Sequence, residues 1–90
     1  MELENKDIRI VILHRGFVYV GRFRQDDSKC ALQNAYNVRR WGTSEGLGQL
    51  AFQGPLQNTQ LDACGTVRFH ELAVIATIDC DVEKWDHVLV

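Results

Sequence analysis

Residues Ile8–Arg24, with the sequence IRIVILHRGFVYVGRFR, carry the strongest indication of the fold. Its first half is almost entirely β-branched or aliphatic, and the Arg15-Gly16 pair that follows is suited to a tight turn. From Phe17 onward the side chains alternate with a period of two residues, which is typical of a strand with two different faces. The stretch therefore predicts a β-hairpin. Gly21 inside the second strand predicts a bulge or a sharp bend, of the kind that small barrels use at corners.

The extended pattern continues beyond this hairpin. Asp26-Asp27-Ser28 indicates a second turn, and alternation resumes from Cys30 to Arg40. Three consecutive strands with short connections predict an antiparallel meander.

The periodicity changes in the middle of the chain. The apolar residues from Leu47 to Ala51 recur at i, i+3 and i+4, which predicts a short helix with one apolar face. We expect Thr43 or Ser44 to cap this helix and Gly54-Pro55 to end it.

The last third of the chain is predicted to be a strand region followed by a helix. Asn58–Cys64 is compatible with a brief strand, and Asp62–Gly65 with a turn. Thr66–Asp79 is long and apolar, but its alternation breaks near His70, so one bulged strand and two short strands both fit. Asp81 is expected to cap a short C-terminal helix.

This order of elements predicts a single, mostly β domain over residues 1–90. We expect a small bent antiparallel sheet, or an SH3-like or Sm-like partly open barrel, with a short mid-chain helix and a short C-terminal helix. A flat sheet with helices on one face is the alternative. Residues 1–7 are expected to be loosely ordered.

The charge is unevenly divided, although the net charge is only −2. Residues 8–44 carry seven basic side chains against two acidic ones, whereas residues 69–90 carry five acidic side chains against one basic one. The two regions are expected either to neutralise each other within one fold or to pair between the subunits of a homo-oligomer.

Several classes of protein are disfavoured. There is no apolar run long enough to span a membrane and no secretory signal, so a cytoplasmic location is expected.

The three cysteines are widely spaced and are expected to be buried free thiols, and no paired ligands at short spacing indicate a metal site. No nucleophile stands beside a general base, so we expect no enzymatic activity and no cofactor. The cysteines are Cys30, Cys64 and Cys80.

The segment Asn34–Ala51, NAYNVRRWGTSEGLGQLA, has a composition that packing alone does not explain. Two arginines and a tryptophan lead into a glycine-rich turn before the predicted helix. Arginine offers a planar fork to phosphate, and amides at a helix start attract anions. The segment therefore predicts a site for an anionic ligand with a flat ring. The candidate ligand-binding residues are Arg22, Tyr36, Arg39, Arg40, Trp41, Thr43, Ser44, Gly46 and Arg68.

A structural role for the same residues is equally compatible with the sequence. Arg39 and Arg40 could be solvated or paired with Glu45 or Asp62. Trp41 could belong to the core or to an interface, and the glycines could serve only to shape a turn.

A motif in this segment carries a family resemblance. Asn-Ala at 34–35 is followed by Arg-Arg-Trp-Gly-Thr-Ser-Glu-Gly-Leu-Gly-Gln-Leu-Ala at 39–51 and by Gly-Pro at 54–55. Further matching residues occur at 61–62, 65–68, 73–75 and 79–85. The chain from about Phe17 onward resembles an uncharacterised family of small proteins that tailed bacteriophages and prophages often encode. The resemblance implies a phage origin and expression inside a host bacterial cell, and it implies no catalytic residues.

Three functions follow from these observations as hypotheses. The first is an oligomeric module that sequesters a small anionic signalling nucleotide, of the cyclic or ADP-ribose type, and so counters host defence as a sponge. The second is a barrel that binds single-stranded nucleic acid. The third is a virion or protein-interaction accessory whose Arg-Trp patch contacts a protein.

Overall fold

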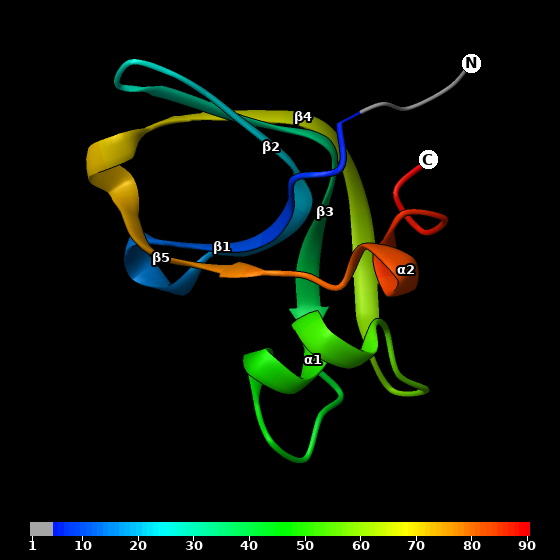
Figure 1. Ribbon diagram of the computed structural model, residues 1–90. Helices are drawn as coiled ribbons and strands as arrows, with labels where there is room; N and C mark the ends of the chain where they lie inside the picture. The colour runs from blue at the N-terminus through cyan, green and yellow to red at the C-terminus, as the bar shows by residue number, and fades with distance from the viewer. Residues whose placement is uncertain (1–4) are drawn as a thin grey trace.

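The computed structural model describes residues 5–90 and is built on a five-stranded antiparallel sheet with the order β4-β3-β2-β1-β5 (Figure 1). The last strand, β5, pairs with the first, β1, and the sheet is strongly bent, while the outer edges of β4 and β5 pair with no strand among these residues (Figure 1). This arrangement is a partly open barrel, and the fold-class prediction is confirmed. The elements are β1 (Ile8–Leu13), η1 (His14–Gly16), β2 (Val18–Asp26), β3 (Lys29–Arg40), α1 (Leu47–Gln53), β4 (Gln60–His70), η2 (Glu71–Ala73), β5 (Val74–Asp79) and α2 (Val82–Trp85).

Two irregularities in adjacent strands bend the sheet. The β2–β3 register shifts at Gly21, as the sequence predicts, and a Cβ atom at this position would lie 3.1 Å from the Leu32 side chain. The β3–β4 register shifts between Leu32 and Ala35, next to Asn34 with a φ of 52°. Both strands therefore turn at the same level, which lets the sheet curl into a barrel.

The sheet carries a hydrophobic core on each face. The inner core fills the barrel with residues such as Val11, Phe23 and Leu32. The outer core lies on the opposite face, where α1, α2 and the residues after α2 cover the strands. Trp85, which is fully buried in the outer core, donates a hydrogen bond from Nε1 to the carbonyl oxygens of Leu50 and Ala51, at 3.2 Å each. This contact ties α2 to α1.

One turn predicted for the second half of the chain is absent from the structure of these residues. The predicted turn at Asp62–Gly65 is wrong, because these residues lie inside β4, where Gly65 with a φ of 77° accommodates a register shift. The predicted break near His70 is confirmed as η2, which carries the chain from one edge of the sheet to the other. Asp81 caps α2 as predicted, since its Oδ1 accepts a hydrogen bond from Glu83 N at 3.0 Å.

The basic and acidic regions of the sequence meet within one subunit. Arg9 Nε lies 3.8 Å from Asp79 Oδ1, and Arg22 Nη1 lies 2.8 Å from Asp86 Oδ1. Of the segment expected to be loosely ordered, residues 1–4 fall outside the described part of the chain. Asn5 and Asp7 hydrogen-bond to β2, where Asn5 Nδ2 donates to Phe23 O at 3.1 Å and Phe23 N donates to Asp7 O at 2.7 Å. Within residues 5–90, no helix has the length and hydrophobicity that a membrane span requires.

Candidate ligand-binding site

The Arg-Arg-Trp segment, residues 39–41, lies at the end of β3, close to α1 in the lower part of Figure 1. Arg39 is exposed and forms an ion pair with Asp62, with 2.7 Å between Nη1 and Oδ2. Arg40 is exposed as well. Trp41 is 44% exposed, and its backbone carbonyl oxygen accepts a hydrogen bond from Thr59 Oγ1 at 2.7 Å. Among residues 5–90 Arg40 has no ion-pair partner, so the segment presents its guanidinium and a half-exposed indole to solvent.

The amides before α1 are already hydrogen-bonded within the chain. The prediction that Thr43 or Ser44 caps the helix is wrong, because α1 begins only at Leu47 and its N-cap residue is Gly46, which has no side chain to supply a cap. Gln49 Oε1 instead reaches back to accept hydrogen bonds from Ser44 N at 3.1 Å and from the following amide, and Thr43 Oγ1 accepts from Gly46 N at 3.1 Å. The amide groups that were expected to meet an anion therefore have internal acceptors.

Gly42, which directly follows the Arg-Arg-Trp segment, is required by packing. Its φ is 68°, and a Cβ atom here would lie 2.4 Å from the backbone of both Asn58 and Thr59. The glycine lets the segment between β3 and α1 lie directly against the chain that enters β4. This glycine therefore has a structural explanation that does not involve a ligand.

Two other predicted site residues lie away from the Arg-Arg-Trp segment. Tyr36 is partly buried and packs against the outer core. Arg22 is 1% exposed, and its guanidinium donates hydrogen bonds to the carbonyl oxygens of Asn5 at 2.8 Å, Asp86 at 3.0 Å and Leu89 at 2.9 Å. Arg22 thereby ties residues near both ends of the described chain to β2, and its donors face away from any open surface.

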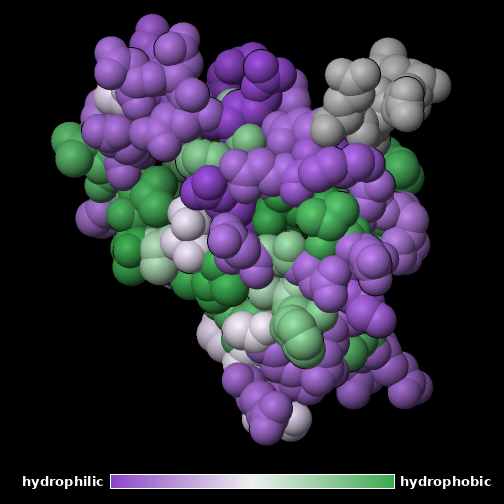
Figure 2. All heavy atoms as spheres, in the orientation of Figure 1, coloured by the Kyte–Doolittle hydropathy of each residue, from purple (hydrophilic) through white to green (hydrophobic). Residues whose placement is uncertain are grey.

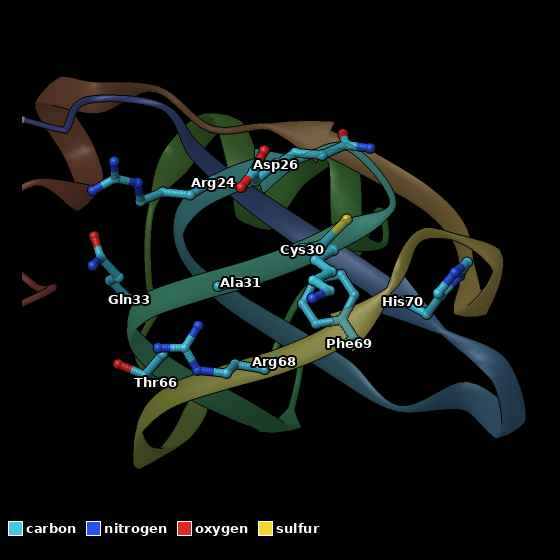
Figure 3. A pocket seen from close by; sticks show the side chains of 11 residues that line it. Arg24, Asp26, Cys30, Ala31, Gln33, Thr66, Arg68, Phe69 and His70 are labelled. Atoms are coloured by element: carbon cyan, nitrogen blue, oxygen red, sulfur yellow. The ribbon is translucent and has the colours of Figure 1, made fainter.

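The remaining predicted residue, Arg68, lies in a hollow on the part of the outer face that the helices leave bare (Figure 3). The strand register places Ala31 of β3 directly between Arg24 of β2 and Arg68 of β4. Figure 3 shows the side chains of Arg24, Gln33 and Arg68 reaching toward the same open side of these strands. The volume of the hollow is about 840 Å³. We call it the basic hollow, lined by Arg24, Gln25, Asp26, Lys29, Cys30, Ala31, Gln33, Thr66, Arg68, Phe69 and His70.

Within residues 5–90, no ion pair neutralises the cations of the basic hollow. Arg24, Lys29 and Arg68 are exposed, and none of them forms an ion pair with another residue in the described range 5–90. Against these three cations the lining carries a single carboxylate, that of Asp26. The hollow therefore has a surplus of positive charge and unused guanidinium donors, which suits an anionic ligand.

Cys30 contributes a thiol to the lining of the basic hollow. Burial raises the pKa of the Cys30 thiol above its ordinary value, with a further contribution from the negative charge of Glu71, so this thiol stays protonated near neutral pH. Burial likewise raises the pKa of Cys80 to about 12. The expectation of three buried cysteines is wrong for Cys64, which is exposed on β4. In the described part of the chain no group of three or more His, Cys, Asp or Glu side chains is placed to hold a metal ion.

Sequence reasoning missed Arg24, which shares the basic hollow with Arg68. The alternation of β2 places Arg22 and Arg24 on one face, but nothing local shows that the chain ends cover the first and leave the second bare. The cross-strand row of Arg24, Ala31 and Arg68 depends on the β3–β4 register, which bulges shift. No protein-family model matches this chain, and none of the curated proteins compared with it matches either.

Proposed function

We propose that this protein is a non-enzymatic binding module that holds a small phosphate-bearing ligand of the nucleotide class in the basic hollow. The observation that carries the proposal is the cross-strand row in which Ala31 separates Arg24 from Arg68. Neighbouring strands lie about 4.8 Å apart, so the Cα atoms of the two arginines are separated by roughly 10 Å. The short Ala31 side chain leaves space between them, and a phosphate in this space would meet a guanidinium fork from each side.

The rest of the lining suits the same ligand. The Gln33 amide and the Thr66 hydroxyl add neutral hydrogen-bonding groups beside the two cations. A volume of about 840 Å³ lies within the range of small-molecule sites, roughly 300–1,000 Å³. Binding without turnover requires no activated nucleophile, and the raised pKa of Cys30 fits that requirement.

Single-stranded nucleic acid is the second candidate ligand. The observation in its favour is the position of Arg40 and Trp41 near the opposite end of β3 from Ala31, where a small nucleotide in the basic hollow would not reach them. A longer strand could place phosphates in the hollow and stack a base on the exposed indole.

The resemblance to small phage proteins supplies a biological setting for the first candidate. A phage-encoded oligomeric module that captures a cyclic or ADP-ribose-type signalling nucleotide would lower its concentration in the infected cell without cleaving it. Such a sponge would counter a defence system that depends on that nucleotide. This role is part of the proposal, and the basic hollow is the feature that supports it.

The direct test is calorimetric titration of the protein with ADP-ribose, a cyclic dinucleotide and a short oligothymidylate. Saturable binding of one of the two nucleotides is expected. Arg24→Ala and Arg68→Ala should each weaken that binding roughly tenfold or more, because a hydrogen bond to a charged group contributes about 1.5 kcal/mol or more.

The matched controls are Arg39→Ala and Arg40→Ala, which remove exposed arginines at the other end of β3. They should leave nucleotide binding unchanged. If they weaken it and the two substitutions in the hollow do not, the ligand belongs to the Arg-Arg-Trp segment. If only the oligothymidylate binds, with an affinity that falls steeply with salt, the nucleic-acid alternative replaces the first candidate.

A further inference from the structure

A second surface of the molecule is apolar and begins at η2, which directly follows His70 of the hollow's lining. Six large hydrophobic side chains are strongly exposed within residues 5–90, and three of them belong to one neighbourhood at the start of β5. Leu72 on η2 is 77% exposed, Ile75 on β5 is 60% exposed, and Phe17 after η1 is 53% exposed. Hydrophobic side chains gather on this side of the molecule, at the left of Figure 2, where Figure 1 places η1, η2 and the start of β5.

Short contacts join these three segments into one surface. Leu13 N donates to Phe17 O at 2.8 Å, which closes η1 against the end of β1. The ring of His14 approaches the carbonyl oxygen of Leu72, with 3.1 Å from Nε2, and so links η1 to η2. Leu13 pairs with Val74 at the start of β5. We call the surface formed by Phe17, Leu72 and Ile75 the β5 patch.

The backbone beside the β5 patch disfavours the addition of a further strand from another molecule. The β1–β5 register shifts between Ile12 and Leu13, and Ile75 on β5 has no partner residue at this point. A bulge on an edge strand interrupts the row of hydrogen-bonding groups that an added strand would need. A partner at this surface would therefore bind through packing of side chains rather than by extending the sheet.

The charges around the β5 patch are self-complementary. Arg15 on η1 and Glu71 on η2 are both exposed, and neither forms an ion pair with another described residue. A two-fold axis through the patch would exchange these positions, so the cation of one copy could meet the anion of the other. A small open barrel also buries limited apolar surface by itself and gains stability by covering more.

We propose that the β5 patch is a two-fold interface with a second copy of this chain. Phe17, Leu72 and Ile75 of each copy pack together at its centre, and Arg15 of one copy pairs with Glu71 of the other at its border. The basic hollow lies on the outer face of β2, β3 and β4 and adjoins the border of this interface, where Glu71 Oε2 accepts a hydrogen bond from Nε2 of the lining residue Gln25 at 2.9 Å.

The first test is sedimentation velocity of the full chain over a series of protein concentrations, without added ligand. A monomer–dimer equilibrium is expected. Ile75→Lys and Leu72→Ser should each raise the dissociation constant of the dimer roughly tenfold or more, since burial of a large aliphatic side chain accounts for about that factor. The control is Phe52→Lys, which changes an equally exposed residue on α1 (71%) and should leave the dimer intact.

The second test separates the specific border contact from general stickiness. Arg15→Glu and Glu71→Arg should each weaken the dimer, whereas the double variant should restore it, because the swapped charges again attract. A wild-type chain that is monomeric at all concentrations overturns the proposal and assigns the patch to another kind of partner. Dissociation by Phe52→Lys, or failure of the double variant to recover while its circular dichroism spectrum is unchanged, also overturns it.

Discussion

Arg22 and Arg24 stand two residues apart on β2 and point to the same face of the sheet, yet their surroundings are opposite. Arg22 lies where the residues after α2 cover the strand, and three carbonyl oxygens and the Asp86 carboxylate surround its guanidinium. Arg24 lies where the same face is bare, and it has no ion-pair partner within residues 5–90. The outer face of the barrel is thus divided into a covered half and an open half.

The difference shows that an arginine is informative about ligands only once its internal acceptors are known. Burial of a guanidinium without acceptors would be prohibitively unfavourable. Arg22 is buried at a low cost because carbonyl oxygens near both ends of the described chain accept its hydrogen bonds. Within residues 5–90, Arg24 and Arg68 have no such acceptors, which leaves their donors for another molecule. On sequence alone the two kinds of arginine look the same.

Replacement of Arg22 should have the largest effect on stability. Arg22→Ala would leave the carbonyl oxygens of Asp86 and Leu89 without their donors and would break the ion pair with Asp86, so the free energy of unfolding should fall by roughly 4 kcal/mol. Arg22→Lys should recover only part of this loss, because an ammonium cannot reach all the acceptors of a planar fork. Urea denaturation followed by circular dichroism gives these values.

The matched variant for this comparison is Arg24→Ala. It should change the free energy of unfolding by no more than about 0.5 kcal/mol, as expected for an exposed residue without structural partners. Equal losses in Arg22→Ala and Arg24→Ala would contradict the division of the face into a covered and an open half.

Gly42→Ala should have the next largest effect on stability, because this glycine lets the segment between β3 and α1 pack against the chain that enters β4. The added methyl group would meet the backbone of Asn58 and Thr59 at 2.4 Å, so the loss should be roughly 3 kcal/mol. Gly46→Ala is the control, since Gly46 also has a positive φ, 91°, but open space around it, and should lose only about 1 kcal/mol. Thermal unfolding of both variants measures the difference, and similar losses would show that the contact at Gly42 is unimportant.

The barrel could be predicted from the sequence because its signals are local. Alternation in Ile8–Arg24, the turn residues and the misfit of Gly21 within a strand each act over a few neighbours and point to the same bent sheet. The prediction of a turn at Asp62–Gly65 was wrong because a glycine with positive φ is compatible with a turn and with a bulge. Only pairing with β3, a distant segment, selects the bulge.

The candidate site was less predictable because it depends on cross-strand neighbours. The Arg-Arg-Trp segment attracts notice through adjacent residues, whereas Arg24 and Arg68 are far apart in sequence and meet only across β3. Likewise, the side chain that satisfies the amides before α1 is Gln49, which lies inside the helix that they precede. Neither arrangement follows from composition or periodicity.

The smallest expected effect concerns the pH dependence of stability, through the Asp86 carboxylate beside Arg22. A hydrogen bond from Lys6, and then the Arg22 guanidinium, lower the pKa of Asp86 below its ordinary value of 3.8 in the folded protein. A carboxylate with a lowered folded-state pKa stabilises the fold above its ordinary pKa, and this contribution is lost as pH falls toward the folded-state value. Asp86→Asn should therefore flatten the decline of the unfolding free energy between about pH 5 and pH 2.

Asp79→Asn is the control for this titration. Asp79 is far more exposed than Asp86 and lies 3.8 Å from Arg9, so solvent screens the pair and the variant should keep the acid dependence of the wild type. Urea denaturation of the three proteins at pH 7 and pH 3 decides between the outcomes. If the unfolding free energy of Asp86→Asn declines with pH as steeply as that of the wild type, the acid sensitivity lies elsewhere. Arg22 would then hold the chain ends only through its hydrogen bonds to carbonyl oxygens.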